Sequence, residues 1–172
     1  LQILINQIKH HETKELTDQY LATYIATVDG NFQRQLASAL SYTKSEATLT
    51  RLLKEWKNKD VVKPQDLAMS WYLTFLQHDF TQGTIWTWAR ENWDWIKAAL
   101  GGDMSFDKFV IYPANIFKTR ERLAEYKAFF EPQLSDLAIS RNISMGIKEI
   151  SARIDLIDKE KAAVEAAIKA TV

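Results

Sequence analysis

The 172-residue sequence contains no cysteine, only three prolines and five glycines, and no excess of either charge, with 22 basic and 22 acidic side chains. The absence of cysteine excludes disulfide bonds and thiolate metal sites. Because the charges balance, no broad electrostatic field would attract nucleic acid or a membrane surface, so we expect neither as a partner. No apolar run reaches the roughly 18 to 20 residues that a transmembrane helix needs.

What the sequence does contain is helical periodicity. Apolar residues recur at spacings of three and four in segments of about 10 to 18 residues, and almost no segment alternates as a strand would. Short helices joined by short breaks pack as antiparallel neighbours. About nine to eleven of them predict an all-α fold, an irregular α-solenoid of antiparallel pairs similar to HEAT and armadillo superhelices. We expect residues 1–172 to form a single helical domain.

The first residues already follow helical spacing, although neither a capping residue nor a methionine precedes them. The apolar positions are Leu1, Leu4, Ile5 and Ile8. A helix that begins without a cap is typical of a chain cut within an element. We therefore expect this sequence to be a fragment of a longer polypeptide.

Helix boundaries are predicted from caps, glycines and prolines. Asp29-Gly30 is interpreted as a turn that stops the preceding helix, and Thr43 with Glu46 as a capping box. Pro64 fits the first position of a helix, where its missing N–H costs nothing. Hydroxyl caps predict three later helix starts, at Thr84, Ser105 and Thr119.

The same reasoning predicts where the later helices end. Gly101-Gly102 should stop the helix that begins at Thr84, and Pro132 the helix that begins at Thr119. Pro113 should kink or end the helix between them. An isoleucine-rich tail follows, for which we predict a break near Asp158. A long coiled coil is the alternative, but its heptad pattern covers only about two heptads. The apolar tail positions are Ile143, Ile147, Ile150, Ile154, Ile157, Val164 and Ile168.

Four of the six tryptophans lie within ten residues, at Trp86, Trp88, Trp93 and Trp95. On a wheel of residues 85–100 the apolar positions cover roughly half of the circumference. Such a wide arc suits a helix packed on two neighbours, so we interpret the cluster as core. Asn92 lies within the arc and must find hydrogen-bond partners. A bridge to a neighbouring loop or helix end is favoured, and a ligand contact is the alternative.

Residue patterns for catalysis are largely missing. The stretch HHETKE lacks the second histidine of a zinc-binding HExxH motif, because position 15 is glutamate. His10 and His11 point about 100° apart on a helix, which suits exposed side chains. His78 is expected to be a C-terminal helix cap. Without GxSxG, P-loop or GxGxxG motifs, the chain is predicted to be inactive alone and to hold no metal or other cofactor.

Four sequence elements follow one another along the chain: VVKPQDL, TIWTWARENWDWI, FKTRERLAEYKAFF and a terminal isoleucine-rich helical pair. Their order and spacing resemble the C-terminal helical domain of zinc aminopeptidases of the aminopeptidase N type. This gluzincin family includes the puromycin-sensitive and endoplasmic reticulum aminopeptidases. Pro64 departs from the pattern, and the tail lacks the tryptophans of many relatives. The matching motif residues, expected to be mainly structural, are Gln65, Asp66, Trp86, Trp88, Asn92, Trp93, Phe117, Thr119, Leu123, Phe129 and Phe130.

The resemblance implies a parent enzyme that hydrolyses N-terminal residues from peptides. Its zinc ligands would lie in a thermolysin-like catalytic domain of the same polypeptide, and this chain would cap the active-site chamber and control substrate access. Lys108, Arg120, Arg122 and Asn92 are the candidate contacts to distal parts of a peptide. We expect a cytoplasmic location. The alternative function is a stand-alone α-solenoid that binds a protein partner.

Overall fold

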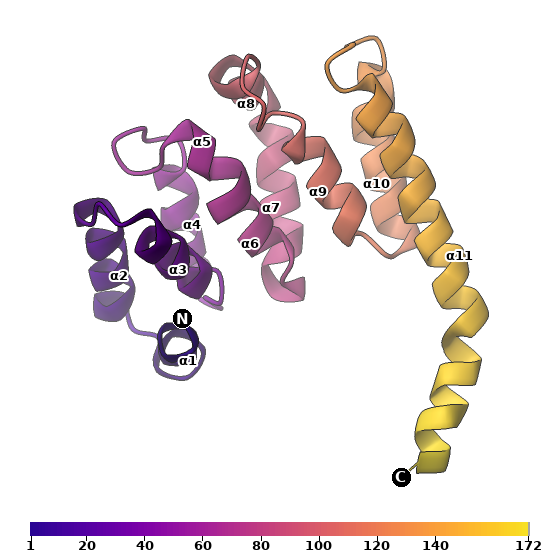
Figure 1. The fold of residues 1–172 in the computed structure, drawn as a ribbon, viewed down its shortest axis with the longest axis horizontal. Helices are drawn as coiled ribbons and strands as arrows, with labels where there is room; N and C mark the ends of the chain where they lie inside the picture. Colours follow the sequence, from indigo (N-terminus) through magenta and orange to yellow (C-terminus); the bar gives the residue numbers. More distant parts are fainter. Residues whose placement is uncertain (172) are drawn as a thin grey trace. The chain divides into compact units, whose positions relative to one another are not determined.

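The computed structural model describes the backbone of residues 1–171 and the side chains of residues 1–170. Every regular element in this range is a helix, which confirms the all-α prediction; the superhelical arrangement of the pairs stays a prediction. The chain divides into two compact units, Leu1–Phe109 and Val110–Val172. Consecutive helices follow one another across the first unit (Figure 1).

The helices of the first unit are α1 (Gln2–His11), α2 (Lys14–Ala26), α3 (Gly30–Leu40), α4 (Glu46–Glu55), α5 (Pro64–Asp66), the π-helix η1 (Leu67–Tyr72), α6 (Leu73–Leu76), α7 (Asp79–Glu91) and α8 (Trp93–Leu100). The remaining elements are α9 (Lys108–Ile116), which begins in the first unit, then α10 (Arg120–Phe130), the 3₁₀ turn η2 (Glu131–Gln133) and α11 (Ser140–Thr171).

An aromatic cluster forms the core of the first unit. The ring of Trp56, at the end of α4, lies 5.0 Å from that of Trp88 in α7 and 5.4 Å from that of Phe75 in α6. Trp71 in η1 stacks on Phe75 at 5.9 Å. Rings of this size contribute large buried areas, and their edge-to-face contacts add to that stabilisation. The cluster therefore joins α4, α6 and α7 into one body.

Asp29 begins a helix instead of ending one. Its carboxylate accepts hydrogen bonds from the N–H groups of Asn31 and Phe32 and so caps α3. The preceding helix α2 has already ended at Ala26, and Val28 is fully exposed in the connection. The turn predicted at Asp29-Gly30 is wrong because the Asp29 side chain satisfies free N–H groups at a helix start.

The cap of α4 also differs from the prediction. The hydroxyl of Ser45 accepts a hydrogen bond from the Thr48 N–H at 3.2 Å. Thr43 does not cap this helix, because α4 begins only at Glu46; its hydroxyl accepts from the Ser45 N–H at 3.2 Å and donates to the carboxylate of Glu12 in the connection between α1 and α2. The Thr43 hydroxyl, which the capping-box interpretation assigned to the helix, is thus hydrogen-bonded to a residue far away in the sequence.

The tryptophan-rich segment forms two helices. α7 begins at Asp79, so Thr84 lies in mid-helix and the cap predicted there is wrong. α7 ends at Glu91, and Asn92 separates it from α8. The side-chain amide of Asn92 donates to the carbonyl of Trp88 at 2.7 Å, so it bonds to the end of its own helix and not to a neighbouring element. Pro64 opens α5 and α8 stops before Gly101, as predicted.

α9 begins later than predicted, and of the two outcomes expected at Pro113, a kink or an end, the helix does not end there. It starts at Lys108, three residues after Ser105, so Ser105 does not occupy the N-cap position. The Lys108 N–H donates to the carbonyl of Ser105 at 3.2 Å. Pro113 lies inside α9, which runs on to Ile116. The proline therefore does not end the helix.

In the second unit, Thr119 caps α10 by accepting from the Arg122 N–H at 3.3 Å, and Pro132 lies in the turn that follows, as predicted. The break near Asp158 is wrong, because α11 is continuous. The sequence after Asp158 is rich in alanine, lysine and glutamate, which are strong helix formers. Figure 1 shows the last turns of α11 extending beyond α10.

Candidate functional site

A surface groove lies between α4 and α7 of the first unit. It consists of two cavities of about 300 and 480 Å³ that share Leu53 and Trp88 as their common floor. The remaining lining of the smaller cavity is Thr50, Lys54, Lys57 and Asn92. The remaining lining of the larger cavity is Gly83, Thr84, Thr87 and Glu91.

The local sequence explains why these side chains face the groove. In α4 the leucines at positions 49 and 52 are buried, so Thr50 and Lys54 lie on the outward side of the helix. In α7 the buried side includes Ile85, Trp86 and Ala89, which leaves Thr84 and Thr87 exposed. Amphipathic helices that pack side by side leave such a channel between their polar faces.

The floor of the groove is held in place by the aromatic core. Trp88 is only 8% exposed, and its ring meets that of Trp56 edge to face at 5.0 Å. Trp95, which is half-buried in α8, lies 6.2 Å from Trp88. Asn92 fixes the end of α7 through its bond to the Trp88 carbonyl. The floor is therefore a rigid aromatic surface with one edge accessible.

The two ends of the groove differ in charge. The smaller cavity contains Lys54 and Lys57 and no carboxylate, whereas Glu91 lines the larger cavity. The structure gives neither lysine an ion pair with any of the described side chains. The ammonium group of Lys57 lies 5.7 Å from the centre of the Trp95 ring, a cation–π distance. The smaller cavity can therefore accept an anionic group.

The three cations expected to contact a peptide each form an ion pair with a carboxylate of the chain itself. Lys108 pairs with Asp107 at 3.4 Å and Arg120 with Asp158 at 2.5 Å. Arg122 pairs with Glu125 at 2.6 Å, and its guanidinium lies 5.7 Å from the Phe117 ring centre. Among the candidate peptide contacts, Asn92 lines the groove. A role for Lys108, Arg120 and Arg122 in contacting a peptide stays a prediction.

The motif residues lie mostly in packed positions. Gln65 is exposed on α5, and Asp66 lines a cavity of about 260 Å³ beside Tyr24. Leu123 and Phe129 are half-buried, and Thr119 caps α10. The buried members are Trp86, Trp88, Trp93, Phe117 and Phe130.

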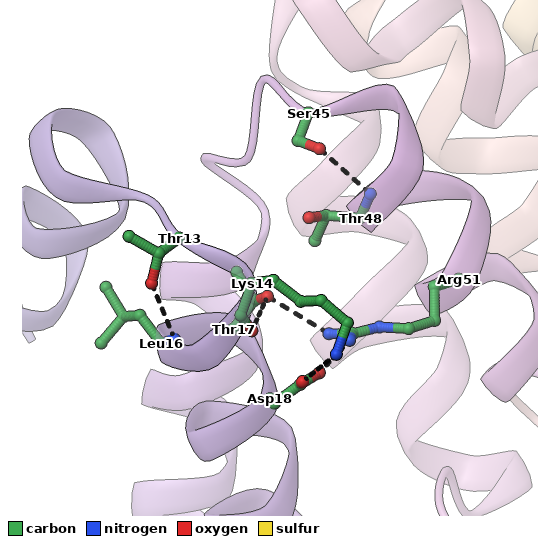
Figure 2. A network of polar contacts seen from close by, with 8 residues as sticks. All are labelled: Thr13, Lys14, Leu16, Thr17, Asp18, Ser45, Thr48 and Arg51. Atoms are coloured by element: carbon green, nitrogen blue, oxygen red, sulfur yellow. Dashed lines mark hydrogen bonds and ion pairs between the residues drawn. The ribbon is translucent and has the colours of Figure 1, made fainter.

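A polar network joins α2 to α4 (Figure 2). Arg51 of α4 donates to the carboxylate of Asp18 and, at 3.2 Å, to the hydroxyl of Thr17. Lys14 pairs with the same carboxylate at 2.7 Å. A cavity of about 270 Å³ lies beside this network, but both cations there already have a carboxylate partner. Arg51 and Asp18 are 33 residues apart, so sequence periodicity gave no sign of this contact.

His78 is a packed histidine, and the C-terminal cap predicted for it is wrong because it lies at the start of α7. Its Nε2 is 3.0 Å from the hydroxyl of Ser41, which itself donates to the carbonyl of Ser38 at 2.7 Å. The contact therefore joins His78 to Ser41 in α3's C-terminal turn. The ring lies between Tyr42 at 4.2 Å and Phe80 at 5.3 Å.

Among the described residues, no three metal-ligating side chains lie close enough together to hold a metal ion. In the same range, no helix combines the length and the apolar character needed to cross a membrane.

Comparison with known proteins assigns the chain to a family. Residues 2–152 match the family described as ERAP1-like C-terminal domain. The chain is 60% identical to aminopeptidase N of Lactococcus lactis subsp. lactis over 97% of its length, and 41% identical to aminopeptidase N of Lactobacillus helveticus over 96%. Aminopeptidase N of Lactobacillus delbrueckii subsp. lactis is 38% identical over 98% of the chain. The chain spans about a fifth of the length of these relatives, 20% in each case.

Proposed function

The chain belongs to the ERAP1-like C-terminal domain family, and on that premise we propose that it is the non-catalytic domain of an aminopeptidase that removes N-terminal residues from peptides. The observation that carries this proposal is the family match over residues 2–152, together with 60% identity to an aminopeptidase N. The described residues contain no group of metal ligands that fits a zinc ion, so we derive no chemical step from zinc in this chain.

The proposed role is to cap the chamber in which peptides are cleaved and to control their access to it. The partner would be the catalytic domain of the same polypeptide, and the substrates would be peptides. The aromatic core supports this role, because it keeps the first unit rigid while a domain closes over an active site. The rings of Trp56, Phe75 and Trp88 supply such rigidity in the first unit.

The test is an activity assay on N-terminally unblocked aminoacyl substrates with the isolated chain and the full-length parent. We expect the isolated chain to be inactive, and the parent to be active and to lose activity when a chelator removes its metal. Restoring activity with added zinc is the control for nonspecific effects of the chelator. A parent that releases no N-terminal residues would refute the proposed function.

A further inference from the structure

We propose that the groove between α4 and α7 binds a short acidic peptide segment, with Lys54 and Lys57 receiving its side-chain carboxylates and Trp88 contacting the apolar residue between them. The inference deepens the proposed function, on which it rests for the source of the peptide, the distal part of a substrate. Three features of the groove support it: its charge, its length and its rigid floor.

The charge of the smaller cavity selects for carboxylates. Lys54 and Lys57 line it without a carboxylate among the lining residues, and Asn92 adds an amide. Elsewhere in the described chain, surface cations such as Arg120 and Lys14 already pair with a carboxylate of the chain itself. Two ammonium groups at one cavity repel each other, and a bound carboxylate relieves that repulsion.

The spacing of the two lysines fits two acidic side chains in an extended peptide. Lys57 lies in the turn that follows α4, where its N–H donates to the Lys54 carbonyl at 3.3 Å, so the two lysines are one turn apart. In an extended peptide, residues i and i+2 point to the same side and lie about 7 Å apart. A Glu-x-Glu sequence therefore matches Lys54 and Lys57, whereas a single C-terminal carboxylate would neutralise only one of them.

The groove is long enough for several residues. Gly83 and Asn92 mark its extent along α7, nine residues of helix at about 1.5 Å each, or about 13 Å. An extended peptide advances about 3.3 Å per residue, so about four residues fit. Thr84 and Thr87 in the larger cavity offer hydroxyl groups to the peptide backbone.

The floor is already in the shape that binding requires. Leu53 is 9% exposed and Trp88 8% exposed, so each presents only an edge to the groove while the rest is packed in the core. A site that needs no rearrangement loses little conformational entropy when a ligand binds. The apolar side chain between the two acidic residues points to the opposite side of an extended peptide, where the edge of Trp88 in α7 can contact it.

The experiment measures binding of three acetylated tetrapeptides to the chain by calorimetry at low ionic strength. The probes are Glu-Leu-Glu-Ala with an amidated C-terminus, the Gln-Leu-Gln-Ala amide, and Gln-Leu-Gln-Ala with a free C-terminal carboxylate. We expect the acidic peptide to bind saturably and about tenfold more tightly than the Gln amide, as two partly exposed ion pairs allow. Its affinity should fall as salt is added.

Variants of the lysines identify the site. The double variant Lys54→Gln, Lys57→Gln should lose the preference for the acidic peptide. The matched control is Lys59→Gln, which removes an exposed lysine outside the lining of the groove and should bind as the original chain does. Circular dichroism and thermal melting establish that all variants remain folded.

Three results would overturn the inference: no saturable binding of the acidic peptide, an unchanged preference in the double variant, or binding of the free-acid Gln peptide as tight as that of the Glu peptide. The last result would assign the lysines to a terminal carboxylate. Because the readout is binding by this chain alone, any of these results leaves the aminopeptidase assignment intact, and an inactive parent leaves the binding result intact.

Discussion

The indole nitrogen of Trp71 donates a hydrogen bond to the hydroxyl oxygen of Tyr24 at 3.0 Å, and the two rings meet edge to face at 5.0 Å. Both side chains are buried, and they are 47 residues apart in the sequence. Burial raises the pKa of the Tyr24 hydroxyl, against the opposing effect of the bond from Trp71. The contact ties the π-helix η1 to α2 in the first unit.

Tyr24→Phe tests this contact. The substitution keeps the ring but leaves the indole N–H of Trp71 buried without its acceptor, so we expect a loss of about 1 to 3 kcal/mol in the free energy of unfolding. Urea denaturation measures the loss. The control is Tyr42→Phe at a half-exposed tyrosine, which should change stability by less than about 0.5 kcal/mol. Equal stability of the two variants would refute a structural role for the hydrogen bond.

Gly146→Ala tests the packing of the second unit. A Cβ atom at Gly146 would overlap the hydroxyl of Tyr126 and the Cβ of Ala114, so α9, α10 and α11 would have to separate. The Tyr126 hydroxyl also donates to the Val110 carbonyl at 3.2 Å. We expect a loss of about 1 to 3 kcal/mol, measured by chemical denaturation.

The matched control for Gly146 is Gly102→Ala. No atom lies within 4 Å of a Cβ built at Gly102, so this variant should stay within about 0.5 kcal/mol of the original chain. If Gly146→Ala were equally harmless, the close approach of α10 and α11 at this position would be contradicted.

Two of the threonines that we expected to be caps, Thr84 and Thr119, should respond in opposite ways. Thr119→Ala removes the hydroxyl that accepts from the Arg122 N–H, and should cost about 1 kcal/mol. Thr84→Ala lies at an exposed position inside α7, where alanine is the better helix former, and should be neutral or slightly stabilising. Thermal melting compares the two. A larger loss for Thr84→Ala would mean that α7 begins where the sequence first indicated.

Acid should destabilise the chain through His78. Burial lowers the pKa of its imidazole, with a further lowering by Lys9 and an opposing effect of Asp79. Lys44 lies over the Phe80 ring on which His78 stacks, so a proton on His78 adds to a region that already holds two ammonium groups. In the unfolded chain the imidazole takes up a proton as the pH falls below about 6.5, while the folded chain resists it.

The contribution of His78 to stability is therefore complete above about pH 6.5 and is lost as the pH falls below that value. The measurement is the unfolding free energy of the original chain and of His78→Gln between pH 7.5 and pH 5. We expect the variant to lose less stability over this range. Parallel pH profiles for the two proteins would contradict the role assigned to His78.

Local sequence predicted the helices better than their ends. The Leu49, Leu52, Leu53 and Trp56 side of α4 and the core position of the tryptophans follow from periodicity alone, because burial of one helix face is what periodicity records. The cap at Thr43 failed because α4 begins two residues later, with Ser45 as its cap, and the Thr43 hydroxyl donates to Glu12 of another connection. No local rule contains that contact.

The groove was only partly accessible to prediction. The helical wheel singled out Asn92, but it treated residues 85–100 as one helix and missed the break that turns this amide toward the Trp88 carbonyl. The sequence analysis did not single out Lys54 or Lys57. One signal was available: no acidic residue lies three or four positions from Lys54, so α4 offers it no ion pair along its own surface.

The most direct test of the proposed function compares kcat/KM of the full-length parent, with and without the region that corresponds to this chain, on peptides of increasing length. If the chain caps the chamber, the complete enzyme discriminates between short and long peptides, and the truncated enzyme, shown to be folded and metal-loaded, loses that discrimination. An identical length profile for the two enzymes would contradict a role in controlling substrate access.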